Sequence, residues 1–548
     1  MTGQQLQVGD YFDGPVVLLN PTSTSYIPPG WQAVVTPTLD VAVGNQEVAV
    51  VGHSHAKIQN QAIDLELFTN RFMAIAEEMG AQLQRTAFSI NVKERLDFSC
   101  ALLDAEGELL VNAPHIPVHL GSLGVCARLV REKIDIGIGD VIITNHPKYG
   151  GSHLPDVTLL AGVFTPTKEL IGYVINRAHH AEIGGRTPGS MPPNATSLIE
   201  EGVVILPTYL VKNGKIQSEA ITHLFTQAPY PTRALTENMA DINAALASLR
   251  TGETALQKLV FEHGLPKVHQ YMQLLKTSAF DALQTALKSY QNQVYKATEC
   301  LDDGSKMVVA ITPPTGREGI FDFKGTTARH PHNLNANISI IYSAILYVLR
   351  LLVNQNIPLN EGLMQGIKVI LPDDSFLHPH FSDDPTQCPA VVGGNTEVSQ
   401  RLVDTLLKAF GLAACSQGTM NNFLFGNDDF GYYETIAGGT GACNGADGRS
   451  GVHQHMTNTR ITDPEELERR YPVRLRQFTL RPNSGGKGLW HGGDGVIRTV
   501  EFLTPLRVTL ITQHRVIAPY GQQGGEDGQT GQQILIKRRN NSKTGGYL

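Results

Sequence analysis

The sequence feature that most constrains the fold is a pair of Gly- and Pro-rich clusters of histidine and carboxylate between Asn145 and Gly189. The first cluster reads NHPKYGGSHLPD and the second reads RAHHAEIGG, with an apolar strand pair between them. Gly- and Pro-rich turns that carry histidine and carboxylate are not expected in a core segment. They are typical of a metal site or an acid–base site at the ends of strands. We therefore expect strands whose ends carry these clusters.

Three residues of the clusters form a candidate ligand set. His153 and Asp156 share one Gly-rich loop after the strand GDVIIT, and His179 follows the strand GYVIN together with His180. Imidazole and carboxylate ligands suit Mn, Fe or Zn and leave positions open for water or substrate. The pattern fits equally well with the alternative, that these are loop residues that satisfy backbone groups.

The pattern along the chain predicts a mixed α/β (α+β) fold with a multi-layer β-rich body and a helical insertion. Residues 1–50 are β-like and too short for a domain, and the body, 55–548, starts near residue 55. Apolar residues at helical spacing predict an amphipathic helix from Asp64 to Arg85 and a helical segment over about 231–295. A hairpin around Asp104–Gly107 and β character after residue 425 are expected, with further strands at 140–144, 159–164, 170–175, 306–325 and 366–372.

Charge and composition exclude several classes of function. A formal net charge of −7 with 17% charged residues leaves no basic field for nucleic acid or an anionic membrane, so small molecules and proteins are the expected partners. The most apolar window, Ile338–Val353, is shorter than a membrane span, which predicts a buried helix. The six cysteines lack CxxC spacing and no secretory signal is present, so we expect reduced thiols and a cytoplasmic protein.

Two groups of ionisable residues precede the first cluster. Glu94, Arg95 and Asp97 lie beside apolar residues in NVKERLDFSC, where charges are costly to bury unless they are paired or used. They form either a structural ion pair or part of the site. His115 and His119 are four residues apart, but the prolines among them predict an extended loop rather than one helical face.

Four later segments concentrate Asn, Thr, Ser and Gln together with Gly. These segments are VVGGNTEVSQR, SQGTMNNFLFG, YYETIAGGTGA and SGVHQHMTNTR. Such side chains can orient a polar substrate, and Glu434, His453 and His455 add ionisable groups. A loop-rich subunit interface is the alternative. The sequence contains no GxxxxGK[ST] motif, so it lacks an ATP site of the P-loop kind.

Together these segments resemble the hydantoinase B/5-oxoprolinase family, which comprises the B subunit of N-methylhydantoinases and the C-terminal half of ATP-hydrolysing 5-oxoprolinase. The resemblance runs from about Asp64 to Gly525. It rests on ordered motifs that include RTAFSINVKERLDFSCALLD, APHIPVHLGS, HPKYGGSHLPD, RAHHAEIGG, VVGGNTEVSQR, SQGTMNN, ETIAGGTGA and GVHQHMTNTRITDPEELERRYP. The N-terminal GPVVLLNPTSTSYIPPGWQAVV looks like the tail of the A component, which precedes B in the fused oxoprolinase.

The resemblance implies ATP-dependent opening of a cyclic amide, either 5-oxoproline or a hydantoin. In that scheme an A component binds ATP and phosphorylates the amide oxygen, and the B component carries the hydrolytic step within a homo- or hetero-oligomer. The ATP-binding body is missing and the family's Gly-rich tail is not reached, so we expect this polypeptide to need an A component. The alternatives are a subunit of an ATP-dependent ketone carboxylase and a non-catalytic assembly subunit.

The resemblance also assigns roles to residues. His153, Asp156 and His179 are expected to bind a divalent metal, with Glu94 as a further candidate ligand. The ion would polarise a carbonyl or lower the pKa of water. Catalytic roles are expected for Glu94, His180, Glu434 and His453, and substrate contacts for Arg95, Asn395, Asn421 and Thr457.

Overall fold

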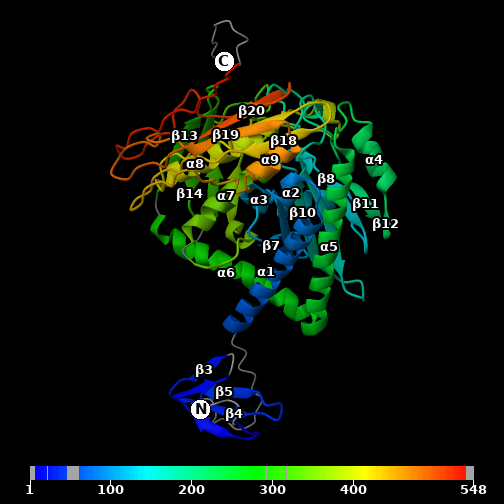
Figure 1. Cartoon of the computed structure of the whole chain (residues 1–548), viewed down its shortest axis with the longest axis vertical. Helices are drawn as coiled ribbons and strands as arrows, with labels where there is room; N and C mark the ends of the chain where they lie inside the picture. The colour runs from blue at the N-terminus through cyan, green and yellow to red at the C-terminus, as the bar shows by residue number, and fades with distance from the viewer. Residues whose placement is uncertain are drawn as a thin grey trace. The chain divides into compact units, whose positions relative to one another are not determined.

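The computed structural model describes residues 6–20, 23–45, 61–290, 293–314, 318–353 and 355–537. The chain divides into two compact units, Met1–Asp64 and Leu65–Leu548 (Figure 1). The predicted domain start near residue 55 lies outside the described residues.

The first unit is built from short strands. β1, β4 and β5 form an antiparallel sheet, and β2 and β3 form a separate hairpin. The strands are β1 (Tyr11–Asp13), β2 (Val16–Leu19), β3 (Thr24–Ile27), β4 (Trp31–Val35) and β5 (Val41–Asn45). Phe12, Leu18, Ile27, Ala33 and Val35 make a small core. The segment consists of β-strands, as its sequence indicates. It forms a compact unit, although we expected a segment of this length to be too short for a domain.

The second unit is organised around a seven-stranded antiparallel sheet of order β12-β11-β8-β9-β10-β6-β7. Its strands are β6 (Phe98–Leu103), β7 (Leu109–Asn112), β8 (Val141–Thr144), β9 (Asp156–Phe164), β10 (Leu170–His179), β11 (Thr208–Lys212) and β12 (Lys215–Ile216). β6 and β7 form the predicted hairpin, and β8, β9 and β10 lie where strands were expected. The central strands are buried on both faces because helices cover both sides of the sheet.

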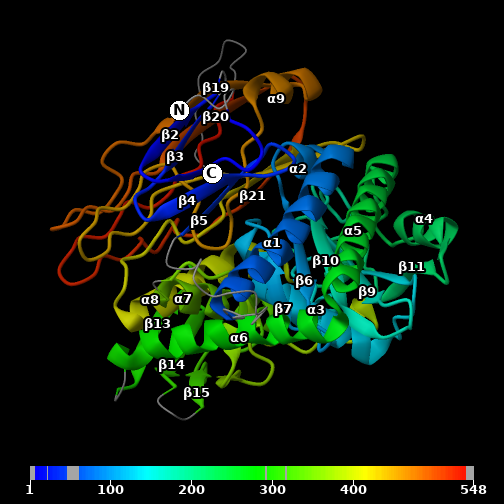
Figure 2. The same cartoon turned by 90° about the horizontal axis from the view of Figure 1, so that it is seen from below.

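The two faces of this sheet belong to different hydrophobic cores. Cys100 and Leu102 of β6 point into one core, and Ala101 and Leu103 point into the other, as expected from the alternation of side chains along a strand. Helices of both layers are visible in Figure 2. The first core includes α1 (Gln61–Thr86), α4 (Ser218–Thr226) and α5 (Leu235–His263), and the second includes α3 (Pro117–Lys133), α7 (Ile338–Leu352) and α8 (Ser399–Phe410).

The predicted helices are confirmed. α1 buries one stripe, which includes Phe72 and Met79, and α5 with α6 (Leu265–Ala286) fills the expected helical segment. α7 matches the apolar window Ile338–Val353 and is a buried helix of the core. Among the described residues, no helix is both long and apolar enough to cross a membrane.

Three smaller sheets complete the mixed α/β fold. One contains β13 (Tyr295–Cys300), β14 (Lys306–Thr312), β15 (Gly319–Asp322) and β16 (Ile367–Ile370). The others are β18-β17-β21 and β19-β20, formed by β17 (Asn422–Gly426), β18 (Gly431–Thr435), β19 (Val473–Leu480), β20 (Val496–Phe502) and β21 (Arg507–Ile511). The short helices are α2 (Ile90–Lys93) and α9 (Pro464–Arg470).

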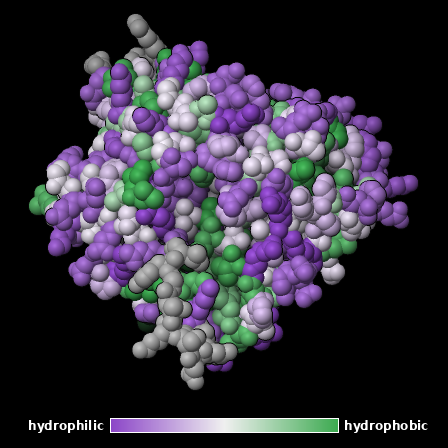
Figure 3. All heavy atoms as spheres, turned by 90° about the horizontal axis from the view of Figure 1, so that it is seen from above, coloured by the Kyte–Doolittle hydropathy of each residue, from purple (hydrophilic) through white to green (hydrophobic). Residues whose placement is uncertain are grey.

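Figure 3 shows hydrophobic residues gathered in the middle of a mostly hydrophilic face.

Candidate metal centre

The three predicted ligands meet at one end of the seven-stranded sheet. β9 begins at Asp156 and β10 ends at His179, and the antiparallel register pairs these two residues directly. His153 lies one turn earlier, where its carbonyl accepts the backbone N–H of Asp156 at 3.1 Å. Ligand atoms of the three residues all lie within 4.8 Å of one another, and no other such group of three occurs in the described part of the chain.

The carboxylate of Asp156 lies at the centre of this group. Its Oδ1 is 3.1 Å from His179 Nδ1, and its Oδ2 is 3.2 Å from His153 Nε2 and 3.1 Å from His119 Nε2. Ser152 Oγ donates to Oδ2 at 2.5 Å. Burial raises the pKa of Asp156, but the imidazoles of His153 and His119 outweigh burial and hold the pKa well below its ordinary value. The group is therefore a buried carboxylate anion.

The donor atoms fit a divalent cation. His153 Nδ1 and His179 Nε2 have no hydrogen-bond partner among the described residues although both are buried, and the buried His153 Nε2 has only the Asp156 carboxylate beside it, at 3.2 Å and without hydrogen-bond geometry. Burial lowers the pKa of His179, so its imidazole is neutral near pH 7 and able to act as a ligand. Unpartnered imidazole nitrogens beside a buried carboxylate are the donor set that Mn, Fe or Zn prefers.

A small pocket opens beside Asp156 and His179, which both line it. Its lining also includes Asp97, His119, Asn395, Tyr433 and Thr457, with Ile116, Val118 and Met420 as apolar members. Asn395 lies in a π-helical turn, Gly394–Val398, that runs directly into α8. Asn395 and Thr457, two of the predicted substrate contacts, thus lie on the pocket wall.

Asp97, which the sequence marked as belonging either to a structural ion pair or to the site, lines the pocket. Its backbone carbonyl accepts the N–H of His179 at 3.0 Å. Its carboxylate accepts no hydrogen bond from the described residues, and burial raises its pKa, against the opposing effect of His179 and Arg95. The sequence position of Asp97 explains why it lies beside His179. Asp97 directly precedes β6, and the pairing of β6 with β10 extends to Ala178, the residue before His179.

Tyr433 restrains one of the candidate ligands. Its ring stacks on the imidazole of His179, with centroids 4.5 Å apart and planes at 20°. The guanidinium of Arg95 lies 4.7 Å from the centroid of the same ring and donates to the Tyr433 carbonyl at 2.6 Å. Arg95 is fully buried and also donates to the Arg460 carbonyl at 3.2 Å. Arg95 therefore holds the pocket wall from behind and does not line the pocket.

The predicted catalytic residues lie apart from the three candidate ligands. Glu94 is exposed at the C-terminal end of α2. It therefore occupies neither a catalytic position nor a metal-ligand position in this structure. His180 points to the opposite side of β10 from His179, where its Nδ1 accepts from Asn238 Nδ2 at 3.0 Å. The alternation of side chains at the end of the strand explains this separation.

Glu434, His453 and Asn421 also lie outside the pocket lining. Glu434 is buried and paired with Arg498, whose Nε lies 2.5 Å from Oε1. His453 has an unpartnered Nδ1 within the described chain, and burial lowers its pKa to about 4. Asn421 lines a separate, larger cavity.

The prediction that His115 and His119 share an extended loop was wrong for His119. Pro117 occupies the first turn of α3, and His119 lies in that helix. Proline is tolerated there because the first N–H groups of a helix have no intrahelical partner. His119 is buried and bridges Ser99 Oγ, 3.0 Å from Nδ1, to Asp156.

The fold and the His–Asp–His group define the chain as a mixed α/β protein with a candidate metal centre at a strand end. A family model described as hydantoinase B/oxoprolinase matches residues 61–546. The chain therefore belongs to the hydantoinase B/oxoprolinase family, as its motifs indicated.

The known proteins that resemble this chain include some more than twice its length and some of similar length. The 5-oxoprolinase 1 of Arabidopsis thaliana is 42% identical, over 98% of this chain and 44% of that protein. An uncharacterized protein of Methanocaldococcus jannaschii is 35% identical, over 87% of this chain and 84% of that protein. The chain thus spans less than half the length of the curated 5-oxoprolinases that it matches.

A solved structure shares the fold. The ATP-dependent caprolactamase from Pseudomonas jessenii superposes with a TM-score of 0.76 at 24% identity, and the match covers 86% of this chain and 88% of that chain.

Proposed function

We propose that this chain carries the hydrolytic step of an ATP-dependent cyclic amide hydrolase. It would open 5-oxoproline or a hydantoin together with a hydantoinase A-like component that binds ATP. The observation that carries the proposal is the convergence of His153, Asp156 and His179 beside a buried polar pocket. Family membership and the likeness to 5-oxoprolinases support the choice of substrate class.

The candidate ligands would hold one divalent ion, Mn, Fe or Zn. Such an ion supplies Lewis acidity toward a carbonyl or lowers the pKa of water. Ser152 and His119 fix the orientation of the Asp156 carboxylate, and Tyr433 restrains the His179 ring. Mutation of groups that orient metal ligands in this way typically lowers metal affinity by about 10- to 100-fold.

Ring opening replaces the C–N bond of the amide by a C–O bond to the oxygen of water. One group must take a proton from that water, and a proton must reach the leaving nitrogen. We assign this transfer to Asp97, whose carboxylate lines the pocket next to His179. Burial raises the pKa of Asp97, a direction that suits a group that both accepts and returns protons.

Asn395 and Thr457 are suited to contact the amide group of the substrate, because the pocket of about 10 Å³ admits a small group and not a whole ring. Both are buried and line the pocket. Asn395 Oδ1 has no hydrogen-bond partner in the described chain, so it is available to accept the N–H of a lactam or imide. A site with a fixed acceptor discriminates strongly against rings that lack the N–H.

The first unit is the part of the chain that we expect to contact the ATP-binding component. It is compact by itself, and it exposes Tyr11, Leu19 and Tyr26, of which Tyr26 is 61% exposed. The family model begins at residue 61, after the strands of this unit. An exposed apolar surface on a unit with so small a core is suited to a protein interface.

The experiment is an assay of phosphate release from ATP with 5-oxoproline or a hydantoin. Turnover should be absent with this chain alone and appear when an A component is added. Asp97→Asn should then lower kcat by about 10²- to 10⁴-fold, the typical contribution of a general base, with the metal content unchanged. Substrate-dependent turnover by the isolated chain would refute the division of labour, and bicarbonate-dependent turnover with a ketone would favour the carboxylase.

A further inference from the structure

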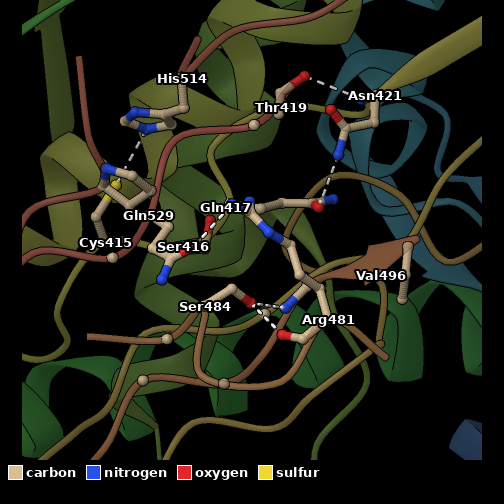
Figure 4. Close-up of a pocket in the computed structure, with 18 of the residues that line it drawn as sticks. Cys415, Ser416, Gln417, Thr419, Asn421, Arg481, Ser484, Val496, His514 and Gln529 are labelled. Carbon is tan, nitrogen blue, oxygen red and sulfur yellow. Dashed lines mark hydrogen bonds between the residues drawn. The ribbon is translucent and has the colours of Figure 1, made fainter. Parts of the chain in front are cut away.

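A second cavity lies among the C-terminal loops. Its volume is about 1480 Å³, and it shares no lining residue with the pocket of the metal centre. Segments far apart in the chain form its wall, including residues 411–417, 439–444 and 519–526. Figure 4 shows its polar residues, among them Cys415 and His514, which face each other. The proposed ring-opening chemistry uses none of these residues.

Cys415 and His514 form a thiol–imidazole pair on this wall. The Sγ atom of Cys415 lies 3.4 Å from His514 Nε2. His514 Nδ1 donates to the carbonyl of Ile517 at 2.6 Å, which fixes the tautomer in which Nε2 carries the lone pair. The imidazole is therefore oriented to accept the thiol proton. Nucleophile, base and a third group that orients the base are the recurring parts of nucleophilic catalysis.

Arg401 supplies a positive charge behind this wall. It is fully buried, NH1 donates to the Cys300 carbonyl at 2.8 Å and lies 3.6 Å from Glu299 Oε2, and Nε and NH2 have no hydrogen-bond partner among the described residues. Gly418 shows where these groups converge, because a Cβ built on it would lie 2.5 Å from His514 Nε2 and 3.3 Å from Arg401 Nε. A buried guanidinium with two unused donors is equipped to stabilise an oxyanion.

We propose that Cys415, His514 and Arg401 form a second reactive centre, in which the Cys415 thiol accepts an acyl group from an activated ester or acyl phosphate. Cys415 Sγ bonds to the acyl carbon as its proton passes to His514 Nε2. The bond from that carbon to the leaving oxygen then breaks, and the His514 proton leaves with the released group or with solvent. The product is a thioester, and water restores the thiol by hydrolysis. Arg401 would hold the carbonyl oxygen while it carries negative charge.

Burial sets the protonation states of the resting pair. Burial raises the pKa of the Cys415 thiol well above its ordinary value, and burial lowers the pKa of His514 to about 4. The resting pair is therefore a thiol and a neutral imidazole, and the proton moves only when the sulfur meets an electrophile. This distinguishes the centre from a preformed thiolate, which would react with any oxidant or alkylating agent.

The test is acetylation of the full chain by p-nitrophenyl acetate, followed by peptide mass mapping. Cys443 provides an internal control because it is exposed and lines the same cavity. We expect Cys415 to acquire acetyl groups faster than Cys443 in the wild type, with about one equivalent of p-nitrophenol released in a burst. Equal or slower labelling of Cys415 would overturn the proposal, and this comparison requires no variant.

Variants separate the roles of Cys415 and His514. Cys415→Ala should abolish the burst, whereas Cys443→Ser should retain it. His514→Gln should slow acetylation of Cys415 by about 10²-fold, the usual scale of a general base, with an unchanged melting curve as the control for folding. A folded His514→Gln protein that labels Cys415 at the wild-type rate would contradict the assignment of the base. None of these readouts depends on the metal centre or on an A component.

Discussion

Asp156 and His179 lie directly opposite each other where β9 begins and β10 ends, with Asp156 Oδ1 3.1 Å from His179 Nδ1. Side chains alternate along a strand, so a slip of one residue would send either group to the other face of the sheet. Both strands are buried on both faces, which fixes their register. The geometry of the candidate centre is thus a direct consequence of strand pairing in the central sheet.

The stacking of Tyr433 on His179 gives a first prediction. Tyr433→Phe keeps the ring and should leave metal affinity within a few-fold of the wild type. Tyr433→Leu removes the stack, and we expect it to weaken affinity by about 10- to 100-fold, as for other groups that orient metal ligands. Titration of both variants with Mn²⁺ or Zn²⁺ measures the difference. Equal affinities for the two variants would show that the stack does not restrain His179.

The buried helix α7 gives a prediction about stability. Leu346 is 1% exposed and Leu351 is 54% exposed on the same helix. Leu346→Asp should cost roughly 3–5 kcal/mol, because it buries an unpaired charge in the core. Leu351→Asp is the matched control and should change the free energy of unfolding by less than about 0.5 kcal/mol. Urea unfolding compares them, and equal losses would argue against the observed orientation of α7.

Glu397 gives a prediction about pH. Burial raises its pKa from 4.5 to about 8, and neither carboxylate oxygen has a hydrogen-bond partner among the described residues. Between these values the folded chain keeps a proton that the unfolded chain releases, so stability falls as pH rises from about 4.5 to 8. Glu397→Gln should remove this loss and gain on the order of 4 kcal/mol over the wild type at pH 8.

The measurement for Glu397 is urea unfolding of the variant and the wild type at pH 5, 6.5 and 8. The exposed Glu78→Gln serves as the control. The advantage of Glu397→Gln should grow with pH across this range. An advantage that is constant or shrinks with rising pH would mean that Glu397 is ionised in the folded protein.

Much of the fold follows from periodicity in the sequence. The apolar stripe of α1, the hairpin of β6 and β7, and the buried helix α7 each have a local pattern that tertiary packing does not oppose. The convergence of the three candidate ligands was also predictable, because His153, Asp156 and His179 are close in sequence and lie at the ends of two neighbouring strands.

The rest of the site depends on contacts between distant segments. Tyr433 reaches His179 from another sheet, and Glu434, predicted as catalytic, is paired with Arg498 of β20. Neither relationship has a sequence pattern. His119 was misplaced because two prolines outweighed the helical signal, although one of them is the first-turn proline of α3. His180 follows His179 in the sequence, but neighbouring residues at a strand end face opposite sides. Adjacency to His179 therefore did not indicate a place for His180 in the site.

The most direct test of the account is the metal content of the purified chain after growth with added Mn, Fe or Zn. The account predicts about one ion per chain in the wild type, its loss in His153→Ala and His179→Gln, and its retention in His180→Gln, whose side chain faces Asn238. Circular dichroism should show that all three variants remain folded. A wild-type protein without metal after supplementation, or a His180→Gln variant that loses metal as completely as His179→Gln, would contradict the central claim.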